Sequence, residues 1–576
     1  MNRAALQQCR GRRFVGSCPV ALPDFYKLQQ GQAGASGLRM TPTDFSNEPV
    51  SVTSSDGAKV RALAARRREA RPMRRYWTLF LAVTFSCGAG AAATRTEPQS
   101  KPATRQAVTA NTVIEAARRA AANPWAPKNL DGSAALQQLT YDQYRDISFN
   151  ADEGIWRNEQ VPFRVELMPA GFIFKMPVKV SIVENRVARG VPGAPGMFSL
   201  GPLVAKQLAN QSLPLSGFRL CLNSRSAWNE FLVFQGASYF RAIDKGGAYG
   251  LSARGLAIRT AHAMGEEFPA FTEFWIERPA ANASGIVVHA LLDSESTTGA
   301  YRFSIIPGSE TIINIDVTLF PRTALDHVGI APLTSMFLFD ESERTRIDDF
   351  RHEVHDSDGL QIALASGERV WRPLRNPRQL QVSSFTSEAP KAFGLIQRSR
   401  RASDYHDLEA HYEDRPSAWI EPTSQWGEGS VQLVEIPTGN EWNDNIVAFW
   451  RPKHVIPAGK PWHTSYRIRW NSQPKLTPAL GKATATRTGP SLDGKRRIFV
   501  IEFSGTGRSI EELKLDAGTS AGKLSNLVLQ PNPLTKGVRA SFELDPGDAE
   551  VAELRLRVLR GNRPASETWL YRWTAS

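Results

Sequence analysis

The sequence predicts an all-β protein with two unequal parts, a large antiparallel β-sandwich followed by a small immunoglobulin-like β-sandwich. Short segments that alternate apolar and polar residues recur about every ten residues from Val161 onward, which is typical of antiparallel sheets. No long helical segments alternate with these strands, so Rossmann and barrel folds are not expected. The chain has 576 residues, 41% hydrophobic and 22% charged, and is long enough to bury more than one core.

The first 93 residues are expected to precede the folded body. Residues 1–72 show no sustained periodicity, and we interpret them as disordered or as the result of choosing too early a start codon. Residues 73–93 resemble a secretory signal peptide, because an arginine pair, a short apolar segment and small residues follow Met73. The apolar segment is shorter than the about 20 residues that span a bilayer, so we expect export without stable membrane insertion. The arginine pair leaves the secretory and twin-arginine export routes open.

Charge is concentrated in this leader. Residues 1–93 carry 14 Lys and Arg against 5 Asp and Glu, or +9, which leaves +4 of the total +13 for residues 94–576. A nearly neutral body argues against nucleic acid as a partner and suits an uncharged sugar polymer. Three of the four cysteines also lie in the leader. The body keeps only Cys221, so it can form no internal disulfide and no cysteine-type metal site.

The large domain is predicted over residues 112–472, after a flexible segment at 94–111. It begins with an alanine-rich helix at 112–122 and a second short helix at 141–147. Its clearest strands are expected at 163–167, 178–183, 286–292, 301–306, 311–319 and 466–470.

The small domain is predicted over residues 493–576. A segment rich in Pro, Gly, Thr, Ala and Lys, 473–492, is interpreted as the linker before it. Five short alternating segments are the expected strands of an immunoglobulin-like sandwich: 498–503, 524–529, 538–544, 552–559 and 567–573.

Two loops rich in carboxylates are the candidate functional segments. Residues 435–445 contain Glu441, Trp442 and Asp444 and run into an apolar strand, and residues 353–359 carry a second acidic group before another strand. Cleavage of a glycosidic bond needs one carboxyl that holds a proton and another that activates water. The two loops therefore predict a carbohydrate-cleaving site, with solvated turns as the alternative.

Several separated motifs, in a fixed order, resemble those of one known family. They include His-Asp-Ser-Asp-Gly at 355–359 and Asn-Asp-Asn-Ile-Val at 443–447, and the others lie at 250–257, 265–269, 274–279, 331–337, 371–374 and 415–419. From about residue 113 onward the chain resembles the glucan biosynthesis protein G/D family, which makes osmoregulated periplasmic glucans and acts on β-1,2-glucan. The resemblance implies a mutarotase-like large sandwich that carries the groove, an immunoglobulin-like domain and a periplasmic location.

Asp444 is the predicted general acid. Its neighbour Trp442 and the apolar strand that follows would raise the pKa of its carboxyl and keep it protonated, whereas the alternative is an aspartate that caps a turn. Spacing does not choose a general base among Glu353, Asp356 and Asp358, and the resemblance points to Asp356. Because no second histidine stands at ligand spacing from the one in this loop, we predict no metal site, and we expect no cofactor.

The substrate-binding residues are predicted from polar and aromatic neighbours. The segment 405–415 offers hydroxyl-binding and ring-stacking groups, and the resemblance implies that the matching loop closes over the glucan, although a solvated loop is the alternative. Tryptophans beside glycine, asparagine or charged residues are expected to stack on pyranose rings, with core residues as the alternative. The predicted set is Asp407, Tyr412, Arg415, Glu441, Trp371, Trp426 and Trp442.

The resemblance implies an enzyme that processes β-1,2-glucan with inversion at the anomeric carbon, by hydrolysis or by transglycosylation and cyclisation. It also implies that protons pass through bound water and a substrate hydroxyl between Asp444, Asp356 and the reacting oxygens. The alternative is a non-catalytic glucan-binding or scaffold protein of glucan backbone synthesis. A sugar mutarotase is a third hypothesis. It rests on fold analogy alone and carries little weight, because a fold does not determine function. The sequence leaves the oligomeric state open, a homodimer included.

Overall fold

The structure is a computed structural model, and it describes residues 107–128, 130, 134–224, 227–344, 347–472, 480–506 and 510–575. The predicted leader 1–72, the predicted signal peptide 73–93 and most of the predicted flexible segment lie outside the described residues. No helix within the described ranges combines the length and the apolar character needed to cross a membrane.

The helices of the described chain are short. Helix α2 (Ala110–Ala121) begins after Thr109, whose hydroxyl accepts a hydrogen bond from the backbone N–H of Thr112. Its apolar side chains Val113 and Ala117 are buried, so the predicted first helix is confirmed. The other helices are α3 (Ala134–Gln137), α4 (Tyr141–Arg145), α5 (Ala205–Leu208), α6 (Ala402–Tyr405) and the 3₁₀ turns η1 (Ala151–Glu153) and η3 (Tyr412–Asp414).

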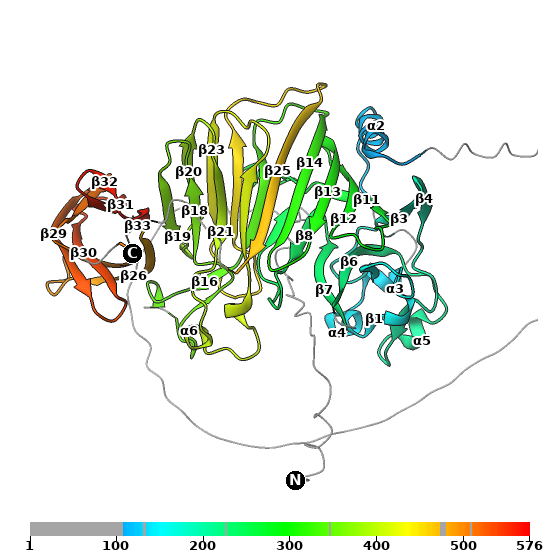
Figure 1. The fold of residues 1–576 in the computed structure, drawn as a ribbon, viewed down its shortest axis with the longest axis horizontal. Helices are drawn as coiled ribbons and strands as arrows, with labels where there is room; N and C mark the ends of the chain where they lie inside the picture. Colours follow the sequence, from blue (N-terminus) through cyan, green and yellow to red (C-terminus); the bar gives the residue numbers. More distant parts are fainter. Residues whose placement is uncertain are drawn as a thin grey trace, which may run out of the picture. The chain divides into compact units, whose positions relative to one another are not determined.

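Sheet 1 is antiparallel throughout and runs in the order β2-β6-β7-β8-β9-β15-β24-β23-β20, with β10 paired to β15. Figure 1 shows its strands in cyan, green and yellow. Its strands are β2 (Phe163–Pro169), β6 (Leu215–Ser224), β7 (Ala227–Gln235), β8 (Tyr239–Ala242), β9 (Ser252–Arg254), β10 (Ala257–Ile258), β15 (Val328–Ser335), β20 (Gln381–Ser387), β23 (Gly429–Glu435) and β24 (Ile446–Pro452).

Sheet 2 runs in the order β28-β31-β33-β19-β18-β21-β22-β25-β14-β13-β12-β11-β3-β4, with β32 paired to β31. Strand β3 is parallel to β11 and β19 is parallel to β33, while the other neighbours are antiparallel. Its strands are β3 (Lys179–Glu184), β4 (Val187–Gly190), β11 (Ala270–Glu277), β12 (Ile286–Asp293), β13 (Thr297–Ile306), β14 (Thr311–Pro321), β18 (Gly359–Ala363), β19 (Arg369–Pro373), β21 (Ala392–Ile396), β22 (Ser417–Pro422), β25 (Trp462–Asn471), β28 (Leu513–Thr519), β31 (Val551–Arg560), β32 (Arg563–Pro564) and β33 (Thr568–Thr574).

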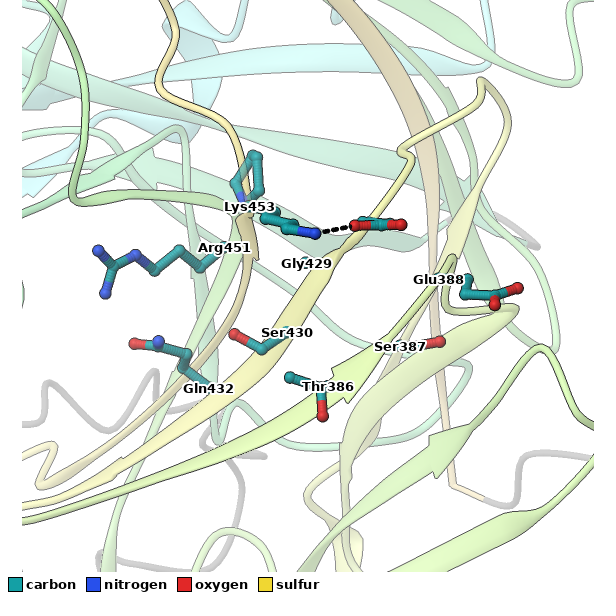
Figure 2. A pocket seen from close by; sticks show the side chains of 10 residues that line it. Thr386, Ser387, Glu388, Gly429, Ser430, Gln432, Arg451 and Lys453 are labelled. Carbon is teal, nitrogen blue, oxygen red and sulfur yellow. Dashed lines mark hydrogen bonds and ion pairs between the residues drawn. The ribbon is translucent and has the colours of Figure 1, made fainter.

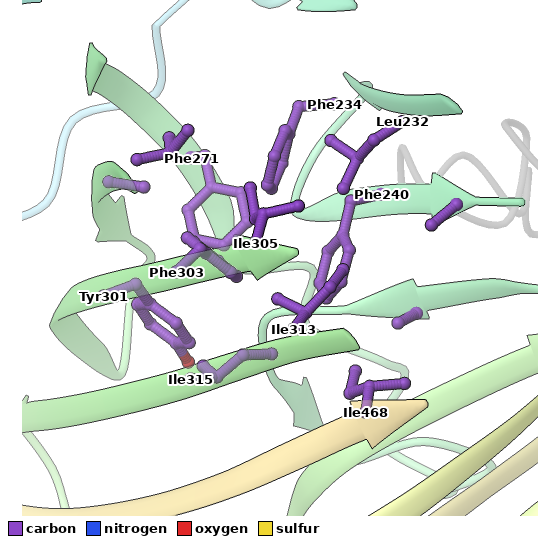
Figure 3. Packing of buried hydrophobic residues seen from close by; sticks show 14 of the residues in the cluster. Leu232, Phe234, Phe240, Phe271, Tyr301, Phe303, Ile305, Ile313, Ile315 and Ile468 are labelled. Atoms are coloured by element: carbon purple, nitrogen blue, oxygen red, sulfur yellow. The ribbon is translucent and has the colours of Figure 1, made fainter. Parts of the chain in front are cut away.

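The core of the large domain lies between these two sheets. Figure 3 shows Phe234 and Phe240 of sheet 1 pointing toward Phe303 and Ile313 of sheet 2. The ring centroids of Phe234 and Phe240 lie 5.1 and 5.4 Å from that of Phe303, which is the spacing of packed aromatic rings. Alternation along each strand sends one set of side chains into this core, so the predicted antiparallel β-sandwich is confirmed.

The small sandwich has its own core, formed between a four-stranded sheet, hereafter sheet 3, and the end of sheet 2. Phe499 of β27 (Arg497–Ser504) stacks on Phe542 of β30 (Gly537–Asp545) and packs edge-on against Trp569 of β33. Strand β26 takes up residues 482–490, so this part of the predicted linker belongs to the sandwich, while residues 473–479 lie outside the described chain. Sheet 3 consists of β26 (Lys482–Pro490), β27 (Arg497–Ser504), β30 (Gly537–Asp545) and β29 (Lys523–Asn532).

Two small strand pairs complete the described structure. They are β1 (Ile147–Phe149) with β5 (Phe198–Leu200), and β16 (Phe337–Phe339) with β17 (Val354–His355). The second predicted helix, 141–147, is shorter than expected. Helix α4 ends at Arg145, and Ile147 already belongs to strand β1 of the first pair. The second pair lies next to both acidic loops and positions them.

Candidate functional site

The two acidic loops are distant in the sequence, but both form hydrogen bonds to the backbone of Met336 and Phe337. Asp356 directly follows β17, and its N–H donates to the carbonyl of Met336 at 2.8 Å. Asn445, the residue after Asp444, accepts a hydrogen bond from the N–H of Phe337 at 2.8 Å and donates to its carbonyl at 3.0 Å. The loop of Asp356 is thus bound at Met336, and the loop of Asp444 is bound at the next residue, Phe337, through Asn445.

Asp444 lies in a place that favours its neutral form. Asp444 is only 2% exposed, and burial raises the pKa of its carboxyl above the ordinary value. The guanidinium of Arg241, 3.5 Å from Oδ2, opposes this increase, while the negative charge of Asp356 adds to it. A carboxyl with a raised pKa beside a second carboxyl is the arrangement that acid and base catalysis requires.

Asp356 is buried with a compensating cation. It is 3% exposed, and the Nη1 of Arg415 donates to its Oδ1. Arg415 also donates to the carbonyl of Ala410 at 3.0 Å, and its Cζ lies 4.1 Å from the ring centroid of Tyr412. The two carboxyls therefore have different surroundings, because Asp356 has a guanidinium in direct contact and Asp444 a more distant one.

Four predicted binding residues gather beside this pair. The hydroxyl of Tyr412 donates to Oε2 of Glu441 at 3.0 Å, and Arg415 connects Tyr412 to the acid pair. Arg351 donates to the same Glu441 oxygen at 2.6 Å and to Oδ2 of Asp407 at 3.0 Å. The structure thus brings Asp407, Tyr412, Arg415 and Glu441 together, and it adds Arg351, which the sequence analysis missed.

The segment 405–415, hereafter the cover segment, lies against the acidic loop 353–359. Tyr405 packs edge-on against His355, with ring centroids 5.3 Å apart, and Arg415 reaches Asp356. Tyr405 itself is fully buried and Arg415 is 5% exposed. The cover segment and the loop 353–359 therefore pack directly against each other beside Asp356.

The three predicted tryptophans have different positions. Trp442 is 56% exposed and lies next to Glu441 in the chain, so its indole is free to contact a ligand. Trp371 is 4% exposed in the core of the small sandwich, with the Cζ of Arg398 3.3 Å from its ring centroid. Trp426 packs on Trp450 at 6.1 Å. The rings of Trp371 and Trp426 both pack against other side chains, and the Trp371 indole also lies against Gly359 at the end of the acidic loop.

His355 forms an ion group with its neighbours. Its Nε2 lies 3.2 Å from Glu353 and 3.9 Å from Asp358, and its Nδ1 lies 3.0 Å from the side-chain oxygen of Gln397. Burial lowers the pKa of His355, but the charges of Asp358 and Glu353 more than offset this effect and raise it to about 9. The ligand atoms of Glu353, His355 and Asp358 are close enough to share a cation, yet a protonated imidazole already satisfies both carboxylates.

The face of sheet 1 opposite the core carries buried polar groups that the sequence analysis did not assign. Tyr239 of β8 and Arg254 of β9 face each other, with the Arg254 Cζ 5.2 Å from the Tyr239 ring. Among the described atoms, the Tyr239 hydroxyl, two Arg254 nitrogens and the Thr334 hydroxyl are buried without a hydrogen-bond partner. Ser252, opposite Thr334, lies beside Asp444. Alternation with the core residue Ala253 was the signal that could have identified this face.

An open pocket of about 630 Å³ lies elsewhere on sheet 1, over β20, β23 and β24. Figure 2 shows its polar lining, with Lys453 pointing toward a carboxylate; that ion pair is with Glu428, at 2.5 Å. The residues that line this pocket include none of the predicted site residues. This pocket is therefore separate from the acid pair.

The fold and site together define an all-β protein of two sandwiches with a buried pair of carboxyls. A family model described as "Periplasmic glucan biosynthesis protein, MdoG" matches residues 109–573. The chain is 47% identical over 470 residues to "Glucans biosynthesis protein G" of Shewanella sp. (strain ANA-3), which covers 81% of this chain and 86% of that protein. It is 46% identical over 491 residues to the protein of the same name from Shewanella baltica (strain OS155 / ATCC BAA-1091), covering 82% and 90%. The chain belongs to the periplasmic glucan biosynthesis protein family, as its sequence motifs indicated.

Proposed function

We propose that this protein is a periplasmic enzyme of osmoregulated glucan biosynthesis that cleaves β-1,2-glucan with inversion at the anomeric carbon. The observation that carries the proposal is the pair of buried carboxyls, Asp444 and Asp356. Their loops bind the neighbouring residues Phe337 and Met336, and their electrostatic surroundings differ. The family membership supports glucan as the substrate class.

In this reaction Asp444 is the general acid. Its raised pKa keeps the proton that must pass to the glycosidic oxygen as the bond to the anomeric carbon breaks. Asp356 is the general base and takes the proton of the attacking oxygen, which forms the new bond on the opposite face of the sugar. The family resemblance implies that bound water and a substrate hydroxyl relay these protons, and the burial of both carboxyls agrees with such a relay. Water as the attacking group gives hydrolysis, and a sugar hydroxyl gives transglycosylation or cyclisation.

The surrounding side chains hold the glucan in this proposal. Glu441, Tyr412 and Asp407 present oxygens to sugar hydroxyls, and Arg415 keeps Asp356 in place. The unpartnered donors of Tyr239 and Arg254 lie on the adjacent polar face and supply further hydrogen bonds. Trp442, which is exposed, stacks on a pyranose ring.

The test is product analysis after incubating the purified protein with linear β-1,2-glucan. Shorter chains identify a hydrolase, and rings or elongated chains identify a transferase. Asp444→Asn and Asp356→Asn are each expected to lower kcat by about 10²- to 10⁴-fold while glucan binding is retained, because each removes one proton-transfer group. Asp326→Asn, an exposed aspartate on another loop, is the matched control and should keep full activity. Equal loss of turnover and affinity in Asp444→Asn would contradict its role as the acid.

A second candidate is a non-catalytic glucan-binding or scaffold protein. The observation that favours it is burial, because Asp356, Asp444 and Arg415 are all 5% exposed or less. Glucan that stays unchanged but bound, with wild-type affinity in both asparagine variants, would establish this candidate and exclude the enzyme.

A further inference from the structure

Three large apolar side chains are exposed on separate loops of the large domain. Phe350 is 77% exposed, Leu408 is 83% exposed and Trp442 is 56% exposed. A single exposed apolar residue is common on a protein surface and needs no explanation. These three call for one, because each is adjacent in the chain to a residue of the same ion-pair network.

Arg351 is the centre of that network. Its Nη1 donates to Asp407 at 3.0 Å and to Glu441 at 2.6 Å, and its Nη2 donates to Asp349 at 2.8 Å. The Arg351 side chain is only 11% exposed, so water competes little for these bonds. One guanidinium thus ties together the loop before β17, the cover segment and the loop before β24.

These contacts link the three chain segments that carry the exposed apolar side chains. Phe350 precedes Arg351 in the chain, and the Arg351 Cζ lies 5.7 Å from its ring centroid. Leu408 follows Asp407, and Trp442 follows Glu441. Because Arg351 contacts both Asp407 and Glu441, these three exposed side chains lie on segments that one guanidinium links, and they are hereafter called the rim.

The rim is connected to the acid pair through side chains in direct contact. Glu441 accepts a hydrogen bond from Tyr412, whose ring lies under the guanidinium of Arg415, and Arg415 binds Asp356. A polymer held between Asp356 and Asp444 that follows this row of polar groups outward would reach the rim next.

We propose that Phe350, Leu408 and Trp442 form an outer subsite that binds a glucose unit of the glucan chain extending from the acid pair. The proposal rests on the proposed function and adds a binding site to it. A pyranose has an apolar face that packs on aromatic and aliphatic side chains, and its hydroxyls suit the charged groups around the rim. Arg351 touches no reacting group and is a positioning residue that fixes the spacing of the three loops.

The test uses β-1,2-linked oligoglucosides of increasing length with Phe350→Ala. We expect KM to rise about three- to tenfold for chains long enough to reach the rim, with kcat unchanged, because one stacking contact is lost. The shortest cleaved chain should show the wild-type KM. Phe350→Trp should restore the long-chain KM, since it keeps an aromatic face. Leu534→Ala, which removes a 90% exposed apolar side chain from the small sandwich, is the matched control.

A second variant examines the positioning role of Arg351. Arg351→Met removes the ion pairs but keeps the length of the side chain, and we expect it to raise the long-chain KM as Phe350→Ala does. Arg351→Lys keeps one charge and should recover part of the loss. Equal KM values for Phe350→Ala and Leu534→Ala at every chain length would overturn the outer subsite.

The outcome can be separated from that of the proposed function. If the wild type binds glucan without turnover, calorimetric Kd values for the same series replace KM. Weaker binding of long chains alone by Phe350→Ala would still support the subsite, and unchanged Kd values at all lengths would overturn it. Loss of affinity for short and long chains alike would also overturn it, because the residue would then act at the inner site or on the fold.

Discussion

Asp444 is only 2% exposed, and the negative charge of Asp356 acts on its carboxyl. Both effects disfavour the ionised form of Asp444. The carboxyl therefore releases its proton at a higher pH in the folded than in the unfolded protein. At a pH below about 3.9, the ordinary value for aspartate, both states are protonated and the residue costs no stability. As the pH rises through the raised pKa, the unfolded state has already released the proton, and the folded state loses stability relative to it.

This linkage gives a prediction for Asp444→Asn. The variant cannot ionise, so its stability relative to wild type should increase between pH 4 and pH 8, and the difference should vanish near pH 3. Urea unfolding midpoints at these pH values measure the effect. Asp326→Asn is the control. The hydrogen bond with His327 lowers the pKa of Asp326, so replacing this aspartate should not increase the stability as the pH rises. Parallel pH profiles for Asp444→Asn and wild type would contradict the raised pKa.

Asp444 as the general acid stays a prediction, and the cause of its raised pKa could be predicted from the sequence only in part. Asp444 was expected to lie among apolar neighbours that included Trp442. The strand residue Ile446 is indeed fully buried, whereas Trp442 is 56% exposed and shields little. Residues far away in the sequence also surround this carboxyl, and two of them, Arg241 of β8 and Ser252 of β9, oppose the increase in pKa that burial causes. Local sequence does not contain these neighbours.

The short pair β16 and β17 holds the acidic loop, and His355 ends its second strand. The imidazole lies between Glu353 and Asp358 and stacks on Phe337 at 5.4 Å. Its pKa is about 9 in the folded state, against about 6.5 in the unfolded chain. The proton it binds on folding therefore stabilises the element fully below about pH 6.5, and this stabilisation is lost as the pH rises through about 9.

We therefore predict that His355→Gln changes the pH dependence of unfolding. Wild type should lose stability between pH 6.5 and pH 9.5, and the variant should lose much less, because glutamine has no proton to release. Urea midpoints at pH 6, 7.5 and 9.5 provide the comparison, with the exposed His454→Gln as the control. If the two proteins showed the same slope, the ion group would not be protonated as described.

At the scale of elements, the sequence located strands but did not predict which strands pair. Alternation located β12 and β14, whose residues on one face are more buried than those on the other, and it located β2 although both faces of that strand are buried. The order of strands in each sheet depends on contacts that alternation does not encode. Arg351 shows the same limit at the site, since its partners Asp407 and Glu441 lie 56 and 90 residues away. Part of the composition taken for a linker, 482–490, became β26 by pairing with β27.

At the scale of the molecule, the small sandwich is joined to the large domain by a buried carboxylate. Glu567 accepts hydrogen bonds from Arg398 at 2.7 and 3.0 Å, from Gln361 at 2.9 Å and from the N–H of Ala483 at 2.8 Å. Its side chain is 2% exposed. Leaving Arg398 without this partner would bury an uncompensated charge.

We predict that Glu567→Gln destabilises the protein by about 3 kcal/mol, because it breaks a buried ion pair by removing one partner. Differential scanning calorimetry should show a lower Tm, or an early transition from the small sandwich alone. Arg398→Met in the Glu567→Gln background should recover part of the loss. Glu428→Gln, which removes an exposed ion pair with Lys453, should leave the transition unchanged. An unchanged Tm in Glu567→Gln would show that the two domains are held by their apolar contacts.

The parallel pair of β19 and β33 has a consequence for how the protein is made. Gln361 and Glu567, which meet at this junction, are 206 residues apart, so a ribosome finishes β19 long before β33 exists. Until then the border of β19 offers unpaired backbone groups to any extended peptide nearby. A nonsense mutation upstream of residue 568 would therefore give a product that aggregates or is degraded by proteases. It would not give a shortened protein that keeps some function.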